Sequence, residues 1–458
     1  MAFPRPLAGV RVVDFTWVRA GPWSARWMAI FGADVIKVEW PERLDSFRRN
    51  QSTVPPGVEE GPNSSGMFAD LHVNKRAITL NVRMPKGMEL IQRLISVSDI
   101  VIENFSSRVM QRWGLGYDEM KKLNPAIIYV SMAGLGHTGR DHAQTTMGPS
   151  AQALSGLTYL SGLPGEPPAG WGWSYLDDTG GMYGAMTALT ALRHRDATGQ
   201  GQHVDLSQMT VGVSLNGSAI LDRTINGRPS RREGYPPGNR TVWPGAPTVN
   251  NYRGPTAVPH NAYRTLGDGY NDWCVIACQS DDEWSALVQV MGSPGWATDE
   301  RLRSLAERIR CQQEVDDGIE AWTLTMDKYK LTAACQAAGV RAMPVQSSED
   351  RVEHDPQLAH RGMYTPISHP VVGDRKVQNA PFKLSKTETD IRGPAPLIGE
   401  HTVDVMSDLL GMSREEVATG FDDGTLWPTD MPRFDYVEET LRCAFSERPV
   451  RRWSERVG

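Results

Sequence analysis

Residues 10–39 contain a short apolar run, a helical pattern and a second apolar run, and this order restricts the fold more than any other feature of the chain. We expect Val10–Phe15 to be a buried strand, Pro22–Phe31 a helix with proline in its first turn, and Asp34–Glu39 a second strand. A helix between two strands returns the chain to the same end of the sheet, so the strands pair in parallel. The segment therefore predicts a compact β-α-β unit.

The same alternation continues further along the chain. Three more apolar strands are expected at Ala77–Val82, Ile100–Glu103 and Ala126–Met132, with helical patterns at Lys86–Val97 and Tyr117–Leu123 between them. Alternation of this kind is typical of a doubly wound parallel sheet with helices on both faces. The fold class is therefore α/β, with a Rossmann-like large domain.

The turn after the first strand shows what this sheet does not bind. It reads Thr-Trp-Val-Arg-Ala-Gly-Pro over residues 16–22 and lacks the glycine pattern GxGxxG of dinucleotide-binding proteins. Glu39 ends the second strand, where a ribose-binding acid stands in those proteins. Without the glycines we do not expect Glu39 to have that role.

Changes in residue pattern divide the chain into four parts. We expect residues 1–227 to form the N-terminal part of the large domain and residues 228–260, which are rich in Pro, Gly and Asn, to form a linker or loop. A second strand-and-helix region, 261–348, is predicted to be a smaller α+β domain. Residues 349–458 are expected to be a linker followed by the C-terminal part of the large domain, with an appended arm at 421–458.

Composition narrows the class of protein. The 458 residues are 40% hydrophobic and 22% charged, with a net charge of −6, which is ordinary for a globular enzyme and argues against nucleic acid or an anionic membrane as partner. Five scattered cysteines without a CxxC pair predict buried free thiols and no metal site. The sequence begins without a signal-peptide core and contains no apolar run of membrane-spanning length, so we expect a cytoplasmic protein.

Two adjacent carboxylates precede a helix of small residues. Asp177 and Asp178 open the stretch Asp-Asp-Thr-Gly-Gly-Met-Tyr-Gly-Ala-Met. An aspartate at this place either caps the helix, as aspartates often do, or is an ionised group that a substrate can approach. The two aspartates alone do not decide between these interpretations.

Collinear motifs over about residues 5–420 give the chain a resemblance. It resembles the class III CoA-transferases, the CaiB/BaiF family that includes formyl-CoA transferase and carnitine CoA-transferase. The motifs are Pro6–Phe15 with Ala20–Pro22, Gly32–Glu39, Asn74–Arg76, Glu103–Phe105, Leu123–Pro125, Thr198–Gln202, His354–Pro356, Ala380–Phe382 and Gly399–Thr402.

The resemblance implies an architecture and an assembly. It implies a doubly wound CoA-binding large domain, started by the N-terminal half and completed by the C-terminal segment, with the smaller domain inserted between. It also implies an interlocked dimer, either a homodimer or a heterodimer with a paralogue.

The resemblance implies a reaction and its nucleophile. Asp177 stands four residues before Gly181, at the position of the family's nucleophilic aspartate, which carries CoA from an acyl-CoA to a free carboxylic acid through anhydride and thioester intermediates. Coenzyme A is then a substrate and product, and no tightly bound cofactor is expected. The CoA contacts implied by motif position are Val18, Leu80, Arg83, Asn104, Phe105 and Arg112.

Departures from formyl-CoA transferase suggest a substrate. Arg19 replaces a glutamine next to the reacting carbonyl, and a guanidinium there either binds a second carboxylate of a donor such as succinyl-CoA or pairs with a protein carboxylate. Trp171 and Trp173, just before Asp177, together with Trp17 and Trp23 suggest a bulky, apolar acid as acceptor. The alternative is that these tryptophans are core residues.

Two other functions remain open. In the racemase branch of the family a His-Asp pair opposes the aspartate, but the matching positions here are Met147 and Gly148, which carry no proton. A non-catalytic CoA-binding partner subunit would not need Asp177. The family's glycine-rich loop is replaced by residues 248–254, and Tyr235–His260 is the segment that we expect to cover the site.

Overall fold

Six parallel strands form the central sheet of the computed structural model, which describes residues 5–161, 167–172, 174–227, 257–387, 389 and 391–427. The strand order is β3-β2-β1-β4-β5-β6, and every neighbouring pair is parallel. This order confirms the doubly wound α/β prediction. The strands are β1 (Arg11–Asp14), β2 (Asp34–Glu39), β3 (Arg76–Thr79), β4 (Ile100–Glu103), β5 (Ile128–Ala133) and β6 (His203–Ser207).

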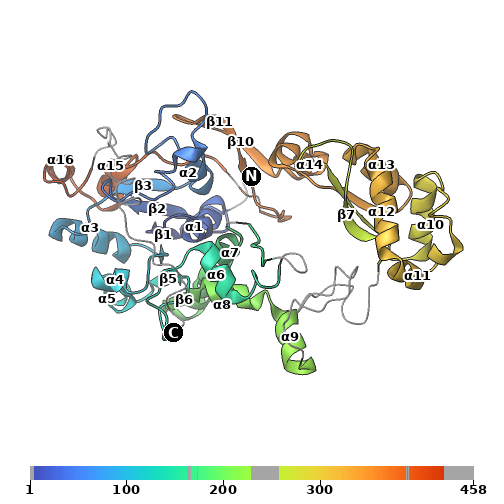
Figure 1. Ribbon diagram of the computed structural model, residues 1–458. Coiled ribbons are helices and arrows are strands. Elements are labelled where there is room, and N and C mark those ends of the chain that lie inside the picture. The colour runs from blue at the N-terminus through green and yellow to red at the C-terminus, as the bar shows by residue number, and fades with distance from the viewer. Residues whose placement is uncertain are drawn as a thin grey trace, which may run out of the picture.

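Helices cover both faces of this sheet (Figure 1). One face packs against α1 (Ala20–Ile30), α6 (Gly148–Ser155) and α7 (Tyr175–Thr198), and the other against α3 (Pro85–Ser96) and α5 (Tyr117–Leu123). The inner strands β4 and β5 are buried along their whole length and mostly apolar, because side chains from both faces enter a core. Short helices α2 (Gly66–Leu71), α4 (Val109–Arg112), α8 (Gln208–Ser214) and α9 (Gly217–Asn226) complete this part of the chain.

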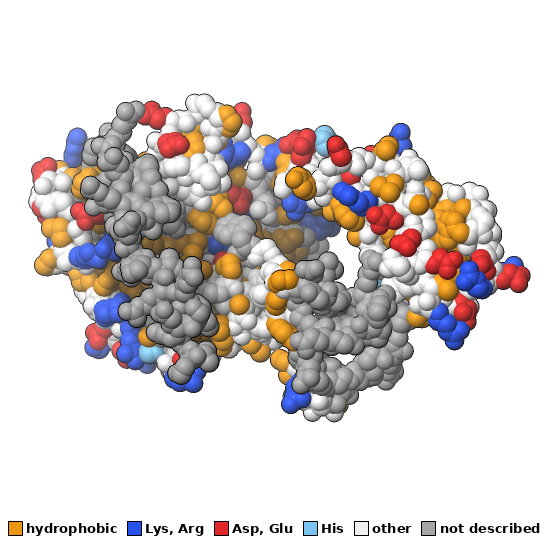
Figure 2. Space-filling model, viewed as in Figure 1, with side chains coloured by type: hydrophobic (Ala, Val, Ile, Leu, Met, Phe, Trp, Pro, Cys, Tyr) orange, Lys and Arg blue, Asp and Glu red, His pale blue; other side chains and the backbone are white. Residues whose placement is uncertain are grey.

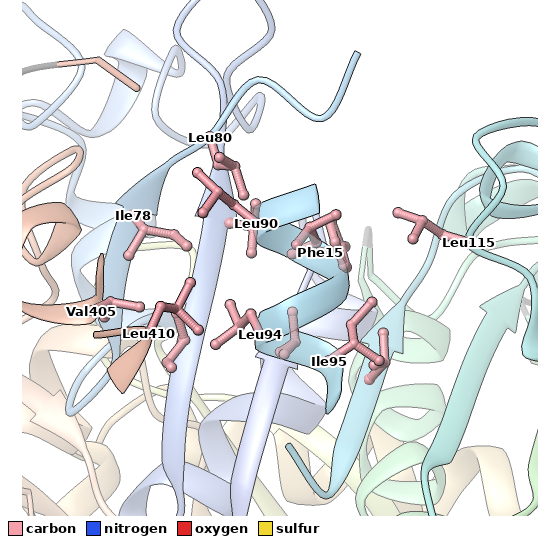
Figure 3. Close-up of a cluster of buried hydrophobic side chains, with 14 of the residues drawn as sticks. Phe15, Ile78, Leu80, Leu90, Leu94, Ile95, Leu115, Val405 and Leu410 are labelled. Carbon is pink, nitrogen blue, oxygen red and sulfur yellow. The ribbon is translucent and has the colours of Figure 1, made fainter. Parts of the chain in front are cut away.

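The C-terminal segment returns to the sheet near its first strands. Val405 and Leu410 lie in one buried cluster with Leu90 and Leu94 of α3, as Figure 3 shows. Their segment comprises α15 (Thr402–Asp404), a π-helical turn at Val405–Leu409 and α16 (Arg414–Asp422). The large core is therefore built from both ends of the chain.

Two smaller antiparallel sheets lie in the intervening chain. β7 (His260–Arg264), β8 (Trp273–Ala277) and β9 (Arg341–Pro344) form one, and β10 (Tyr364–His369) pairs with β11 (Gly373–Gln378) in the other. The three-stranded sheet packs with helices around its own buried cluster. These helices are α10 (Asp281–Val290), α11 (Leu305–Arg310), α12 (Gln312–Thr323) and α13 (Lys328–Ala337); α14 (Pro356–Arg361) precedes β10.

The structure differs from the sequence prediction at three elements. β6 was not expected, because its residues are mostly polar and only Leu206 is buried, as befits an edge strand. The helical pattern at 302–324 is divided into α11 and α12 at Cys311. Helix α7 begins at Tyr175, so Asp177 lies in its first turn and not ahead of it.

No helix among the described residues is both long and apolar enough to cross a membrane. On the face shown in Figure 2, acidic and basic side chains are interspersed and do not separate by sign.

Helices α1 and α7 approach closely through glycine. A Cβ atom on Gly181 would lie 2.6 Å from the carbonyl oxygen of Ala20 and 2.9 Å from Cδ1 of Trp23. Both neighbours are buried and belong to a rigid helix, so neither can move away without cost. The contact sets how α7, and hence Asp177, sits against the turn that follows β1.

We predict that Gly181→Ala destabilises the protein by about 1–2 kcal/mol. Overpacking typically costs about 1–3 kcal/mol, which exceeds the gain of up to about 1 kcal/mol from replacing a helical glycine by alanine. Gly217→Ala is the matched control, because no atom lies within 4 Å of a Cβ placed there. Urea unfolding of both variants measures the difference in stability. Equal urea midpoints would show that the contact between α1 and α7 accommodates the added methyl group.

Candidate active site

A cavity opens at the carboxyl ends of the central strands. It has a volume of about 340 Å³ and is lined by the turn after β1, the segment after β4, the segment after β5, and side chains of α7 and α8. The strand order reverses between β1 and β4, and ligands of doubly wound sheets bind at this point. Asp177 is one of the lining residues.

The carboxylate of Asp177 is held from two sides. Its Oδ1 accepts a hydrogen bond of 2.9 Å from Nε2 of Gln208, the first residue of α8. Its Oδ2 faces the backbone of Gly148, where an added Cβ would lie only 2.2 Å away. Asp177 therefore makes no side-chain cap for α7, whose N-cap residue is Ser174.

Burial raises the pKa of Asp177 above that of an ordinary aspartate. The neighbouring charge of Asp178 acts in the same direction, whereas the hydrogen bond from Gln208 and the charge of Arg19 lower the pKa. The sequence prediction of an ionised carboxylate did not include this upward shift, because burial cannot be read from residues 177 and 178 alone.

Arg19 is engaged by the protein. Its Nε and Nη2 atoms donate to the two oxygens of Asp178 at 2.5 and 3.0 Å, and its guanidinium lies 5.5 Å from the ring centre of Trp23. Of the two interpretations left open by the sequence, pairing with a protein carboxylate is the one observed. Arg19 nevertheless lines the cavity.

The turn that carries Arg19 is fixed by polar contacts. The amide of Asn104 donates to the carbonyl oxygen of Trp17 and accepts from its backbone N–H, at 2.8 and 2.7 Å. Val18 has a positive φ of 65°, which is unusual for a β-branched residue, and its N–H donates to Asp45 at 3.0 Å. Buried Lys37 in turn contacts Asp45 at 3.4 Å.

A second cavity of about 240 Å³ adjoins the first. The two share three lining residues, Trp17, Phe105 and Val109, so they meet beside Phe105. The second cavity has aromatic walls, and its lining includes two arginines, Arg43 and Arg83. Its further aromatic residues are Phe15, Trp40 and Trp113.

The structure brings together most of the residues expected to contact CoA. Val18 and Asn104 line the cavity of Asp177, Leu80 and Arg83 line the second cavity, and Phe105 lines both. Arg112 is exposed at the end of α4 and is not among the described residues that line either cavity.

Arg43 and Gln208 were missed by the sequence analysis. Arg43 lies four residues after Glu39, and Trp40 and Arg43 form an isolated antiparallel bridge that turns Arg43 back to the strand end. Gln208 directly follows β6, and the polar character of that strand concealed the signal. A polar residue at the carboxyl end of a parallel strand is the pattern that would have found it.

The tryptophans separate into different surroundings. Trp17 lines both cavities, and Trp23 is buried in the core against Trp27. Trp171 is 45% exposed, with its ring 5.1 Å from that of Tyr175, and it is not among the lining residues. Trp173 lies outside the described residues, as do 235–256 of the expected covering loop and 428–458 of the C-terminal arm.

Other ionisable groups near the cavities have structural partners. Glu39 is buried, lines the second cavity and accepts hydrogen bonds from Arg48 at 2.8 Å; that it does not bind a ribose stays a prediction. Among the described residues, no group of three or more His, Cys, Asp or Glu side chains is placed to hold a metal ion.

Comparison with known proteins identifies relatives over almost the whole chain. The chain is 32% identical to succinyl-CoA–D-citramalate CoA-transferase of Chloroflexus aurantiacus, over 91% of this chain and 96% of the relative. It is 31% identical to succinate–glutarate CoA-transferase of Agrobacterium fabrum, over 89% of this chain and 97% of the relative. It is 30% identical to formyl-CoA:oxalate CoA-transferase of Rhodopseudomonas palustris, over 93% of this chain and 98% of the relative.

A crystal structure of a CaiB/BaiF family protein from Brucella suis has the same fold, with a TM-score of 0.77 and 28% identity over 89% of this chain and all of that one. The model of the family described as CoA-transferase family III matches residues 7–402. The chain belongs to CoA-transferase family III, and it is a class III CoA-transferase.

Proposed function

We propose that this enzyme transfers CoA from an acyl-CoA thioester to a free carboxylic acid, with Asp177 as covalent nucleophile. The observation that carries the proposal is a partly buried carboxylate in one cavity, next to a second cavity with aromatic and arginine side chains. Adenine stacks well on aromatic rings, and arginine binds phosphate. The nucleotide of CoA would occupy the second cavity, and its thioester would reach Asp177 past Phe105.

The proposed reaction proceeds by exchange at two carbonyl groups. Asp177 attacks the donor thioester, which forms a mixed anhydride and releases the CoA thiolate. The thiolate attacks the aspartyl carbonyl and expels the donor acid, leaving an aspartyl-CoA thioester. The acceptor carboxylate displaces CoA to form a second anhydride, and the thiolate then takes the new acyl group and frees Asp177.

The character of the Asp177 cavity bears on the substrates. Its lining includes the polar residues Ser106, Gln144, Thr145 and Thr146, and of the four tryptophans considered above only Trp17 is described there. We propose succinyl-CoA as donor, as in the name of the Chloroflexus aurantiacus relative, and a small, polar acid as acceptor. Trp171 does not line the cavity, which weakens the argument for a bulky apolar acceptor, whereas Trp173 lies outside the described residues.

The alternatives are less well supported. Met147 and Gly148 line the cavity where the racemase branch has its second proton carrier, and neither can exchange a proton. A non-catalytic subunit would leave unexplained why Asp177 is held by Gln208 within a ligand-sized cavity.

Replacing the nucleophile tests the reaction. Asp177→Asn keeps an oxygen for the hydrogen bond from Gln208 but cannot form the anhydride, so kcat should fall on the order of 10³–10⁶-fold while CoA binding is unchanged. Asp178→Asn is the comparison variant, because it removes a neighbouring carboxylate and leaves the nucleophile. An Asp177→Asn protein that keeps several per cent of wild-type activity without deamidation would rule out the assignment.

The same variant predicts a pH effect on stability. The pKa of Asp177 is raised in the folded protein, so ionisation favours the unfolded state and stability is lost as pH rises through the ordinary aspartate range. Asp177→Asn should therefore melt at a higher temperature than wild type at pH 7. The difference should shrink as pH falls towards about 4. A lower melting temperature for the variant at pH 7 would contradict the raised pKa.

The second cavity gives a binding prediction. Arg83→Ala should raise KM for the acyl-CoA about five- to tenfold with little change in kcat, because an exposed arginine contributes modestly to phosphate binding. Arg303→Ala, an equally exposed change of charge outside both cavities, is the control. Equal KM values for the two variants in steady-state assays would place the nucleotide elsewhere.

An apolar surface supports assembly with a second copy. Met182, Met186 and Leu189 of α7 are about half-exposed and line, with Trp27 and Phe382, a cavity of about 850 Å³ whose walls are almost entirely apolar. Contiguous exposed apolar surface often marks a site of protein–protein contact. We propose that it is covered in an interlocked homodimer.

Sedimentation equilibrium at micromolar concentration should give twice the chain mass. Leu189→Glu places a charge in the apolar cavity and should reduce the dimer, whereas Leu123→Glu, at an exposed leucine on α5, should not. A folded wild-type monomer would refute the homodimer, and a paralogous chain that then restores the doubled mass would show a heterodimer.

A further inference from the structure

Gln208 is placed by the edge strand β6. The strand pairs with β5 and ends at Ser207, whose side chain caps α8 by accepting from the N–H of Thr210 at 3.3 Å. Gln208 is only 8% exposed, yet it lines the cavity of Asp177. Gly180 leaves space for it, because a Cβ there would lie 3.2 Å from Cγ of Gln208.

The hydrogen bond between Gln208 and Asp177 involves a reacting atom. On the proposed function, on which this inference rests, two steps take place at the side-chain carbonyl carbon of Asp177. In each step a nucleophile adds to that carbon, and the electron pair of the C=O double bond moves to the oxygen. The charge that develops there requires a hydrogen-bond donor at about 2.7–3.1 Å.

We propose that Gln208 is a catalytic residue, and that its side-chain N–H stabilises the oxyanion that forms on Oδ1 of Asp177. In the first step the CoA thiolate forms a C–S bond, the charge rests on Oδ1, and collapse breaks the bond to Oδ2, which leaves within the donor carboxylate. In the second step the acceptor carboxylate adds, the charge again rests on Oδ1, and the C–S bond breaks to release the thiolate.

The position and charge of Gln208 suit this role. Its Nε2 already lies 2.9 Å from Oδ1 in the free enzyme, so the donor is in place before reaction. A neutral amide leaves the aspartate more nucleophilic than a cation in direct contact would, and the nearest arginine, Arg19, is held by Asp178. On the other side of the carboxylate, the absence of a side chain at Gly148 leaves room beside Oδ2.

The test measures formation of the aspartyl-CoA thioester. Gln208→Met keeps the length of the side chain but removes the donor. After rapid mixing with succinyl-CoA and acid quenching, mass spectrometry of the peptide that contains Asp177 reports the CoA adduct. We expect the adduct to form about 10²–10³-fold more slowly than in wild type. We expect kcat to be lower by the same factor, with KM for succinyl-CoA nearly unchanged.

Gln312→Met is the matched control. Gln312 is a glutamine of similar burial, 7% exposed, in α12, and its replacement measures the cost of losing a buried amide away from the site. If the adduct forms as fast in Gln208→Met as in wild type, the proposed role of Gln208 is overturned, whereas Asp177 stands as the nucleophile. If the wild-type enzyme gives no adduct on Asp177, the nucleophile and the role of Gln208 both fail.

A pH profile separates this role from a structural one. The hydrogen bond from Gln208 lowers the pKa of Asp177, so its loss should move the acid limb of kcat/KM to higher pH in Gln208→Met and not in Gln312→Met. A limb at the same pH in wild type and Gln208→Met would show that the amide does not act on this carboxylate, and would overturn the proposal.

Discussion

The paired hydrogen bonds between Asn104 and the backbone of Trp17 hold the centre of this molecule together. They join the segments that leave β1 and β4, the two strands between which the winding of the sheet reverses. An open sheet leaves these two segments free to diverge, and only a contact between them keeps the crevice at a fixed width. The turn after Trp17 also presents Arg19 to Asp178 in the first turn of α7, so the link bears on the placement of that turn.

The sheet was predictable because its inner strands are buried on both faces and are therefore apolar runs. The motif positions also placed Asp177 and most of the residues around the two cavities, among them Val18, Leu80 and Phe105. Polar and local features were not predictable. Leu206 is the only buried residue of β6, so neither that strand nor Gln208 after it could be recognised, and Arg43 reaches its cavity through a turn that no spacing rule anticipates. The division into domains and the roles of the site residues stay predictions.

The two neighbouring aspartates illustrate how identical side chains are given different chemistry. Asp178 is neutralised by a bidentate arginine, which anchors it and limits its electrostatic effect on the residue before it. Asp177 is partly buried, which raises its pKa, and it receives a hydrogen bond from a neutral donor, which acts in the opposite direction. Arg19 is paired with Asp178 and also lines the cavity of Asp177, so its interaction with a substrate carboxylate stays a prediction.

The return of the C-terminal segment to the first strands has a consequence for synthesis of the chain. Thr79 at the end of β3 exchanges hydrogen bonds with the backbone of Trp427, 348 residues later, and Leu410 closes the core over α3. While the chain grows on the ribosome, this edge of the sheet stays uncovered until nearly all described residues have emerged. Contacts so distant in sequence form slowly and leave apolar surface exposed meanwhile. A newly made chain therefore passes through a long period in which it is a natural client of chaperones.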